Sequence, residues 1–336
     1  MTSPTGSDVV VLTGFLGSGK TTLLRDYLSG PEAADTAVIV NEVGEIGLDG
    51  VILRENGDTP IAMLSNGCIC CQAGTDLAYT IDRLLATERP GATGPLRRIV
   101  LETSGLSRPG PVLRQLAALA NHRLRVSVLA TFDATRGTAT AEFEEAAAQW
   151  AAAHRIVVTK ADVVPAEALA RAGEEVASLN PLAELVATAN RDSAVAAAFA
   201  PLARTTATAP PEVAPVHPRI AVRLAQPSAI LAYDDLTSWL DNLAGALGER
   251  LLRLKGLVRV KESERPLLVQ SVGTAFAAPR PIGAPDGPLF LVIIARDLQA
   301  GELEAVAPAG LFAFAAWTPA ALPGAGTLSP VAVAWL

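Results

Sequence analysis

Cysteine is scarce in this sequence, and all three copies, Cys68, Cys70 and Cys71, fall within a single pentapeptide. An odd number of clustered cysteines is a poor basis for a disulfide framework. In a reducing compartment, where disulfides are rare, such a cluster is better suited to a metal or redox site. The cysteines therefore exclude a small disulfide-stapled protein and direct attention to one segment of the chain.

The sequence also lacks long apolar runs and an excess of positive charge. Apolar stretches such as Leu311–Trp317 are too short to span a bilayer, which takes about 20 residues. The formal net charge of −7 argues against a broad electrostatic surface for nucleic acid or for an anionic membrane. The polar start, residues 1–8, has no basic region, so we expect no signal peptide and a cytoplasmic location.

The bulk composition is that of a globular protein. Hydrophobic residues make up 50% and charged residues 18% of 336 residues, which excludes a disordered chain and allows two domains with a sizeable core. The abundant alanine favours helices.

Residues 14–22, Gly-Phe-Leu-Gly-Ser-Gly-Lys-Thr-Thr, carry the strongest signal in the chain. They lie between an apolar run at 9–12 and a helical pattern from residue 23, which is the strand, glycine loop and helix of a P-loop. Glycines let such a loop wrap a phosphate chain, the lysine reaches the β- and γ-phosphates, and the first threonine ligates Mg²⁺. A glycine-rich turn that merely opens a helix is the alternative. The predicted nucleotide-binding residues here are Gly14, Gly17, Ser18, Gly19, Lys20, Thr21 and Thr22.

Strand and helix patterns alternate over residues 8–203, so we predict an α/β domain with a doubly wound, mostly parallel sheet. The expected strands are 9–12, 36–40, 60–64, 98–101, 126–131, 155–158 and 183–188, and the expected helices begin at 23, 74, 111, 141 and 165. Polar or glycine-rich motifs follow most of these strands. Because ligands of open α/β sheets bind outside the carboxyl ends of the strands, these motifs should converge on one site.

The pattern changes after a Pro-rich linker at 204–218, which we expect to be stiff and extended. Residues 219–307 suggest a smaller α+β domain with a mainly antiparallel sheet. Its predicted strands are 219–224, 256–260, 266–272 and 289–294, and its helix spans 234–247, with Asp234 or Asp235 near the cap. Residues 308–336 are rich in Ala, Pro and Gly and receive no assignment.

Two further segments fit a GTP site. Glu102 follows the apolar strand 99–101, as a Walker B acid that holds Mg²⁺ would, and Gly105 could offer its N–H to the γ-phosphate. Residues 159–162, Thr-Lys-Ala-Asp, resemble the guanine-reading Asn-Lys-x-Asp: Asp162 would accept from guanine, Lys160 would pack along the base, and Thr159 replaces the asparagine. A surface acid at a strand end and an ordinary helix cap are the respective alternatives.

Three thiols as close as Cys68, Cys70 and Cys71 can bind one soft ion. Zn²⁺ or Co²⁺ takes four tetrahedral ligands, so a carboxylate is needed. We choose Glu42, at the end of a neighbouring predicted strand, with Glu45 in reserve. Buried core cysteines or a thiol redox switch are the alternatives.

Taken together, these stretches resemble the CobW-type metallochaperone GTPases of the SIMIBI class of P-loop proteins. The resemblance runs from about Val9 to Ala305 and includes Asn41–Glu45, Gly67–Cys71, Glu102–Leu106 and, before a predicted strand, Arg253–Gly256. It implies GTP hydrolysis, with Lys20, Thr21 and Glu102 acting on phosphate and Mg²⁺, coupled to binding and release of Zn²⁺ or Co²⁺. It also implies a client metalloprotein.

Two features depart from the family pattern: Thr159 in place of asparagine, and the absence of a His-rich tract, with His122 the one candidate accessory ligand. Because the metal motif lies between the P-loop and Glu102, we expect nucleotide to control it. A regulatory GTPase with incidental cysteines, a P-loop kinase or ATPase, and a metal-storage protein are the rival classes. The sequence names neither the metal nor the client, and it leaves the oligomeric state open.

Overall fold

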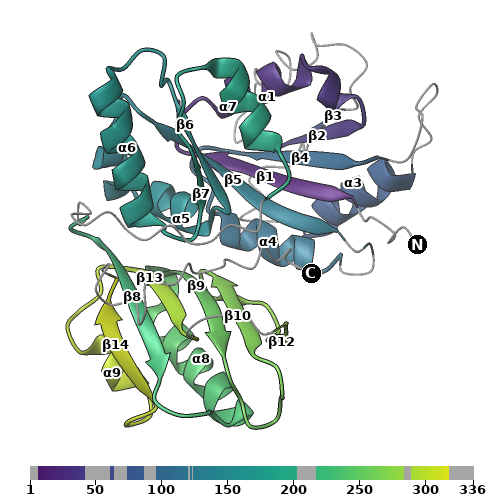
Figure 1. Ribbon diagram of the computed structural model, residues 1–336. Helices are drawn as coiled ribbons and strands as arrows, with labels where there is room; N and C mark the ends of the chain where they lie inside the picture. The colour runs from purple at the N-terminus through teal and green to yellow at the C-terminus, as the bar shows by residue number, and fades with distance from the viewer. Residues whose placement is uncertain are drawn as a thin grey trace. The chain divides into compact units, whose positions relative to one another are not determined.

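The computed structural model describes residues 7–41, 61–63, 74–86, 96–119, 122, 124–202, 217–283 and 289–317. They form two compact units, with the main division after Leu202 (Figure 1). Within these ranges no helix is both long and apolar enough to cross a membrane. The predicted metal ligands Glu42, Glu45, Cys68, Cys70 and Cys71 lie outside the described residues, as does most of the predicted linker.

The first unit is an α/β domain built on one sheet. In chain order its elements are β1 (Asp8–Gly14), α1 (Lys20–Leu28), η1 (Pro31–Ala33), β2 (Thr36–Asn41), β3 (Ile61–Met63), α3 (Gly74–Ala86), β4 (Arg98–Thr103), α4 (Pro109–Ala117), β5 (Arg125–Asp133), η3 (Gly137–Glu142), α5 (Glu144–Ala152), β6 (Arg155–Thr159), α6 (Ala166–Leu179), β7 (Glu184–Val186) and α7 (Arg191–Phe199). The strand order is β3-β2-β4-β1-β5-β6-β7. Every pairing among the described strands of this sheet is parallel, which confirms the predicted fold class.

Helices cover both faces of this sheet, which explains why its strands are continuously apolar. On one face, α1 buries Leu24 and Tyr27 against a cluster that includes Val10 and Val100. Phe199 of α7 stacks on Tyr27 with ring centroids 3.9 Å apart. Figure 1 shows α3, α4 and α5 on the opposite face. The central strand β1 is thus fixed from both sides, and the loop that follows it starts from a rigid position.

The second unit is an antiparallel sheet with a helix on one face. Its elements are β8 (Ile220–Pro227), α8 (Tyr233–Leu247), η4 (Gly248–Arg250), β9 (Leu251–Val258), β10 (Leu267–Val272), β11 (Ala275–Phe276), β12 (Arg280–Pro281), β13 (Leu291–Arg296), α9 (Glu302–Val306) and β14 (Phe312–Ala316). The strand order is β11-β10-β9-β13-β8-β14, with β12 beside β10. The apolar side of α8, including Trp239 and Leu243, packs on Leu254 and Ile293 of the sheet.

The short elements β11, β12 and α9 were not predicted, and three longer segments differ from the sequence prediction. Strand β9 begins at Leu251 instead of 256, so Arg253–Gly256 lies within a strand and not before it, because two buried cations interrupt the apolar pattern. The helix expected over 141–153 is divided at Phe143, whose extended backbone separates η3 from α5. Strand β14 pairs with β8 inside the stretch that the sequence left unassigned.

Lys255 on β9 gives the second unit a testable pH dependence. Its side chain is 8% exposed, and burial, followed by repulsion from the Arg253 guanidinium, lowers its pKa from 10.5 to about 7. Between these pH values the unfolded chain holds a proton that the folded chain has lost, so stability rises with pH. Relative to a Lys255→Met variant, we expect the unfolding free energy of the natural chain to increase between pH 7 and 9, by at most about 1.4 kcal/mol per pH unit.

The measurement is denaturant unfolding of the full chain at several pH values. Lys261→Met removes an exposed lysine of the same unit and serves as the control. Parallel pH curves for the natural chain and Lys255→Met would show that Lys255 is not the titrating group.

Candidate functional site

The glycine loop follows β1 directly and ends at the first residue of α1, where the motif predicted it. Gly14, Gly17 and Gly19 all have positive φ angles, of 144°, 70° and 87°. A Cβ on Gly14 would lie 2.0 Å from Oγ1 of Thr131 on β5, so only glycine fits there. The loop therefore has the backbone shape that wraps a phosphate chain.

Lys20 lies at the start of α1 with its side chain turned into this loop. Its ammonium donates to the carbonyl oxygens of Gly14 at 2.8 Å and Phe15 at 3.3 Å. The residue is 9% exposed, so its charge is concentrated on the loop. This is where a P-loop lysine meets the β- and γ-phosphates.

Hydroxyl side chains of the loop and of two neighbouring strands also hold the loop backbone. The Ser18 hydroxyl donates to Phe15 O at 2.6 Å and also hydrogen bonds with Thr131 Oγ1 at 2.6 Å. Thr159, at the end of β6, donates to Ser18 O at 2.8 Å. These contacts hold the loop in one conformation without a ligand, so less conformational entropy is lost when phosphate binds.

Thr21 and Glu102 form a pair suited to Mg²⁺. The Thr21 hydroxyl donates to Glu102 Oε1 at 2.7 Å, and Glu102 is 3% exposed at the carboxyl end of β4, next to β1. Mg²⁺ prefers oxygen ligands and binds through a carboxylate together with substrate phosphates. The donor set therefore fits the ion: Thr21 would ligate it directly and Glu102 through water.

Gly105 follows the β4 acid and approaches the glycine loop very closely. A Cβ on Gly105 would lie 2.7 Å from the backbone nitrogen of Leu16 and 2.9 Å from its Cα. The Gln149 amide on α5 donates to Gly105 O at 3.0 Å and to Ser107 O at 2.9 Å. Gly105 is therefore held beside the phosphate loop, as a γ-phosphate sensor requires.

We expect Gly105→Ala to weaken GTP binding about tenfold or more, because the new methyl group has to push the Leu16 backbone aside. Titration with a fluorescent GTP analogue measures the change. Gly245→Ala on α8 is the control, since a Cβ there meets nothing within 4 Å and alanine favours the helix. Equal GTP affinity in the natural chain and Gly105→Ala would contradict the close packing.

The segment 159–162 reaches the site as well, and Thr159 contacts the phosphate loop. Its hydroxyl donates to the carbonyl oxygens of Ser18 at 2.8 Å and Phe132 at 3.1 Å, so Thr159 supports the phosphate loop. Lys160 has a positive φ of 56° and donates to Asp133 Oδ2 at 2.6 Å. Asp162 is exposed, which leaves its carboxylate available to a base.

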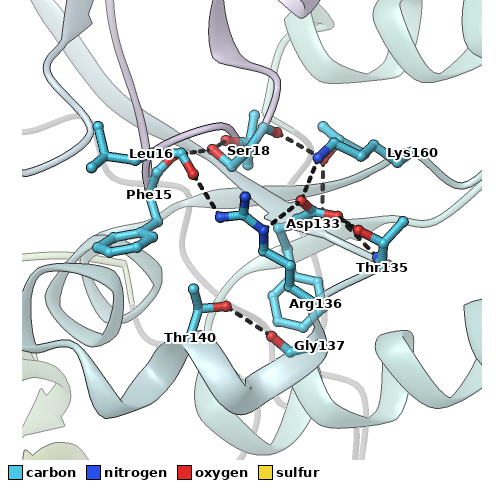
Figure 2. A network of polar contacts seen from close by, with 12 residues as sticks. Phe15, Leu16, Ser18, Asp133, Thr135, Arg136, Gly137, Thr140 and Lys160 are labelled. Carbon is cyan, nitrogen blue, oxygen red and sulfur yellow. Dashed lines mark hydrogen bonds and ion pairs between the residues drawn. The ribbon is translucent and has the colours of Figure 1, made fainter.

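Asp133 at the end of β5 is a buried acid that the sequence analysis gave no role. Burial opposes its ionisation, but hydrogen bonds from Lys160 and Thr135 outweigh burial, so its pKa lies below the ordinary value. Arg136, three residues later, donates to Leu16 O at 3.0 Å (Figure 2). No motif marks Asp133, Arg136 or Gln149, since each acts on a segment distant in sequence.

Among the described residues no group of three or more His, Cys, Asp or Glu is arranged to hold a metal ion. His122 is the candidate accessory ligand, and its Nε2 atom lies 2.6 Å from Asp82 Oδ1. The cysteine site predicted at Cys68, Cys70 and Cys71 lies outside the residues that can be described.

The glycine loop with its lysine, the Thr21–Glu102 pair and the segment after β6 meet at the carboxyl edge of a parallel sheet, which defines a P-loop nucleotide-binding protein. Two family models match the chain: the CobW/HypB/UreG nucleotide-binding domain over residues 8–187 and the cobalamin synthesis protein CobW C-terminal domain over residues 222–307. The chain therefore belongs to the CobW/HypB/UreG family and is a GTPase of the CobW type.

Relatives match over different lengths. The zinc chaperone YjiA of Escherichia coli strain K12 is 30% identical over 88% of this chain and 96% of its own length. The zinc chaperone CobW of Pseudomonas aeruginosa is 34% identical, but the match covers 54% of this chain and 56% of that relative. The crystal structure of the Zn(II)-bound YjiA GTPase from E. coli has the same fold, with a TM-score of 0.60 over 90% of this chain and 98% of that chain at 24% identity.

Proposed function

We propose that this GTPase carries zinc and delivers it to a client metalloprotein under the control of its nucleotide. The ion is held by Cys68, Cys70 and Cys71 together with Glu42, with Glu45 in reserve. Relatives that are called zinc chaperones support zinc over cobalt as the cargo. The nucleotide is GTP with Mg²⁺, bound by the glycine loop, Thr21 and Glu102.

The positions at which β2 and β3 end are the observation that supports this proposal. β2 pairs with β4 so that Asn41 lies opposite Thr103, one residue after the Mg²⁺ acid Glu102. β3 pairs with β2, with Met63 opposite Val40. The chain therefore leaves the sheet for Glu42, and later for the cysteine segment, from the edge that carries the nucleotide site.

This arrangement suggests how nucleotide and metal are coupled. Segments that begin beside a γ-phosphate and its Mg²⁺ are ordered by those groups and released on hydrolysis. We infer that GTP brings Glu42 to the thiolates and completes four ligands, and that hydrolysis loosens Glu42 so that zinc passes to the client. The coupling is reciprocal, so zinc tightens GTP by the same factor by which GTP tightens zinc.

The donor set is tested with Co²⁺ as a spectroscopic substitute for zinc. Cysteine thiolates give Co²⁺ a charge-transfer band that carboxylate and imidazole ligands do not. We expect Cys68→Ala to weaken this band, because one of three thiolates is lost, and Glu42→Gln to keep the full band while weakening the affinity. His122→Ala is the control and should change neither, because His122 already pairs with Asp82. A full band in Cys68→Ala would refute the proposed ligands.

A further inference from the structure

The guanidinium of Arg136 lies against the outside of the phosphate loop, although the side chain is 48% exposed and is not needed to fill the core. Its Nη1 donates to Leu16 O at 3.0 Å. A Cβ on Gly17 would lie 3.4 Å from its Nη2, so the guanidinium also packs against the next residue of the loop. Arg136 therefore contacts one particular peptide unit, the one that joins Leu16 to Gly17.

Fixing the Leu16 carbonyl also fixes the direction of the Gly17 N–H, which belongs to the same peptide unit. The Leu16–Gly17 bond is trans, so the carbonyl and the N–H point in opposite directions. Because Arg136 holds the Leu16 carbonyl, the Gly17 N–H is turned away from Arg136. Inward N–H groups are what a P-loop offers to phosphate oxygens.

Arg136 is itself held in place by the turn that follows β5. Asp133 Oδ1 accepts from the backbone and the hydroxyl of Thr135, and Asp133 O accepts from the Arg136 N–H at 3.1 Å. The Arg136 Nε lies 3.6 Å from Asp133 Oδ2, the same oxygen that accepts from Lys160 Nζ at 2.6 Å. Figure 2 shows the resulting chain of contacts, from Lys160 through Asp133 and Arg136 to Leu16.

We propose that Arg136 is a positioning residue for the nucleotide, which keeps the Gly17 N–H directed at the phosphates and links the 159–162 segment to the phosphate loop through Asp133. Arg136 acts through the loop backbone and does not touch the nucleotide. The positioning role of Arg136 requires the GTPase site but not the zinc site. A failure of the proposed zinc site would therefore leave this role untouched.

The first test compares Arg136→Ala with Arg125→Ala. Arg125 is 47% exposed and paired with an aspartate, Asp8, so it is matched in charge and exposure, but it lies at the opposite end of β5. Losing one charge-assisted hydrogen bond to the loop should weaken both GDP and GTP about tenfold in Arg136→Ala. Arg125→Ala should bind both nucleotides like the natural chain.

A second readout separates positioning from a general loss of structure. In the GDP complex of the natural chain, the Gly17 amide should be protected from hydrogen exchange, and Arg136→Ala should lose this protection while amides of β4 keep theirs. Arg136→Lys keeps a donor and should recover part of the affinity. In a double-mutant cycle, Asp133→Asn should cost little more once Arg136 is alanine, because both act through one chain of contacts.

Two results would overturn the proposal. One is nucleotide affinity in Arg136→Ala equal to that in Arg125→Ala. The other is a fall in kcat alone, with GDP and GTP affinities and Gly17 protection unchanged, which would make Arg136 a group that acts directly on the transition state.

Discussion

Replacing Lys20 with alanine is expected to weaken GTP binding by at least about a hundredfold. Lys20 is 9% exposed, and its ammonium is held at the loop by the Gly14 and Phe15 carbonyls. Removing one partner of such a buried ionic contact with phosphate costs about 3–5 kcal/mol, and each 1.4 kcal/mol is about tenfold in affinity. Titration of a fluorescent GTP analogue against the natural chain and Lys20→Ala measures the loss.

Arg25→Ala is the matched control, because it removes a cation from the same helix at a side chain that is 45% exposed. It should bind GTP like the natural chain. The thiols of Lys20→Ala should still react and bind metal, since they belong to a different segment. GTP affinity in Lys20→Ala within a few-fold of the natural value would show that the glycine loop is not the phosphate site.

A Glu102→Gln substitution is expected to lower kcat for GTP hydrolysis about a hundredfold or more, with a smaller change in GDP affinity. The amide keeps the size of the side chain and can still accept from Thr21 Oγ1, which lies 2.7 Å from the carboxylate. It lacks the negative charge that would hold Mg²⁺, an ion that would neutralise charge developing during phosphoryl transfer. Steady-state hydrolysis measured over a range of Mg²⁺ concentrations tests this.

A high Mg²⁺ concentration should restore part of the activity of Glu102→Gln, because the substitution weakens the binding of Mg²⁺. Glu32→Gln removes an exposed acid from η1 and should leave both kcat and the Mg²⁺ dependence unchanged. If Glu102→Gln hydrolysed GTP at the natural rate with the natural Mg²⁺ requirement, the Thr21–Glu102 pair would have no part in holding Mg²⁺.

The parts of the site that the sequence predicted are those with a fixed local spacing. Lys20, Thr21 and three glycines with positive φ lie in one nine-residue stretch, and Glu102 follows a short apolar strand. Such groups are recognisable because one loop and one strand end bring them together, and contacts with distant segments are not needed.

The parts that escaped prediction depend on contacts between distant segments. Arg136 meets Leu16 across 120 positions and Gln149 meets Gly105 across 44, and neither spacing leaves a pattern in the sequence. The start of β9 was missed for a different reason, since Arg253 and Lys255 are buried cations in a strand. The contact of Thr159 with the phosphate loop was not predicted because its acceptor, Ser18 O, is a backbone atom of another loop.

The central claim is that GTP and zinc bind this chain with reciprocal coupling. The most direct measurement is a competition titration of Zn²⁺ against a chromophoric chelator, with reduced thiols, in the presence of Mg²⁺ and either a non-hydrolysable GTP analogue or GDP. We expect one zinc site that is at least about fivefold tighter with the analogue and is lost in Cys68→Ala. Equal zinc affinity in the two nucleotide states would show that nucleotide and zinc bind this chain without coupling.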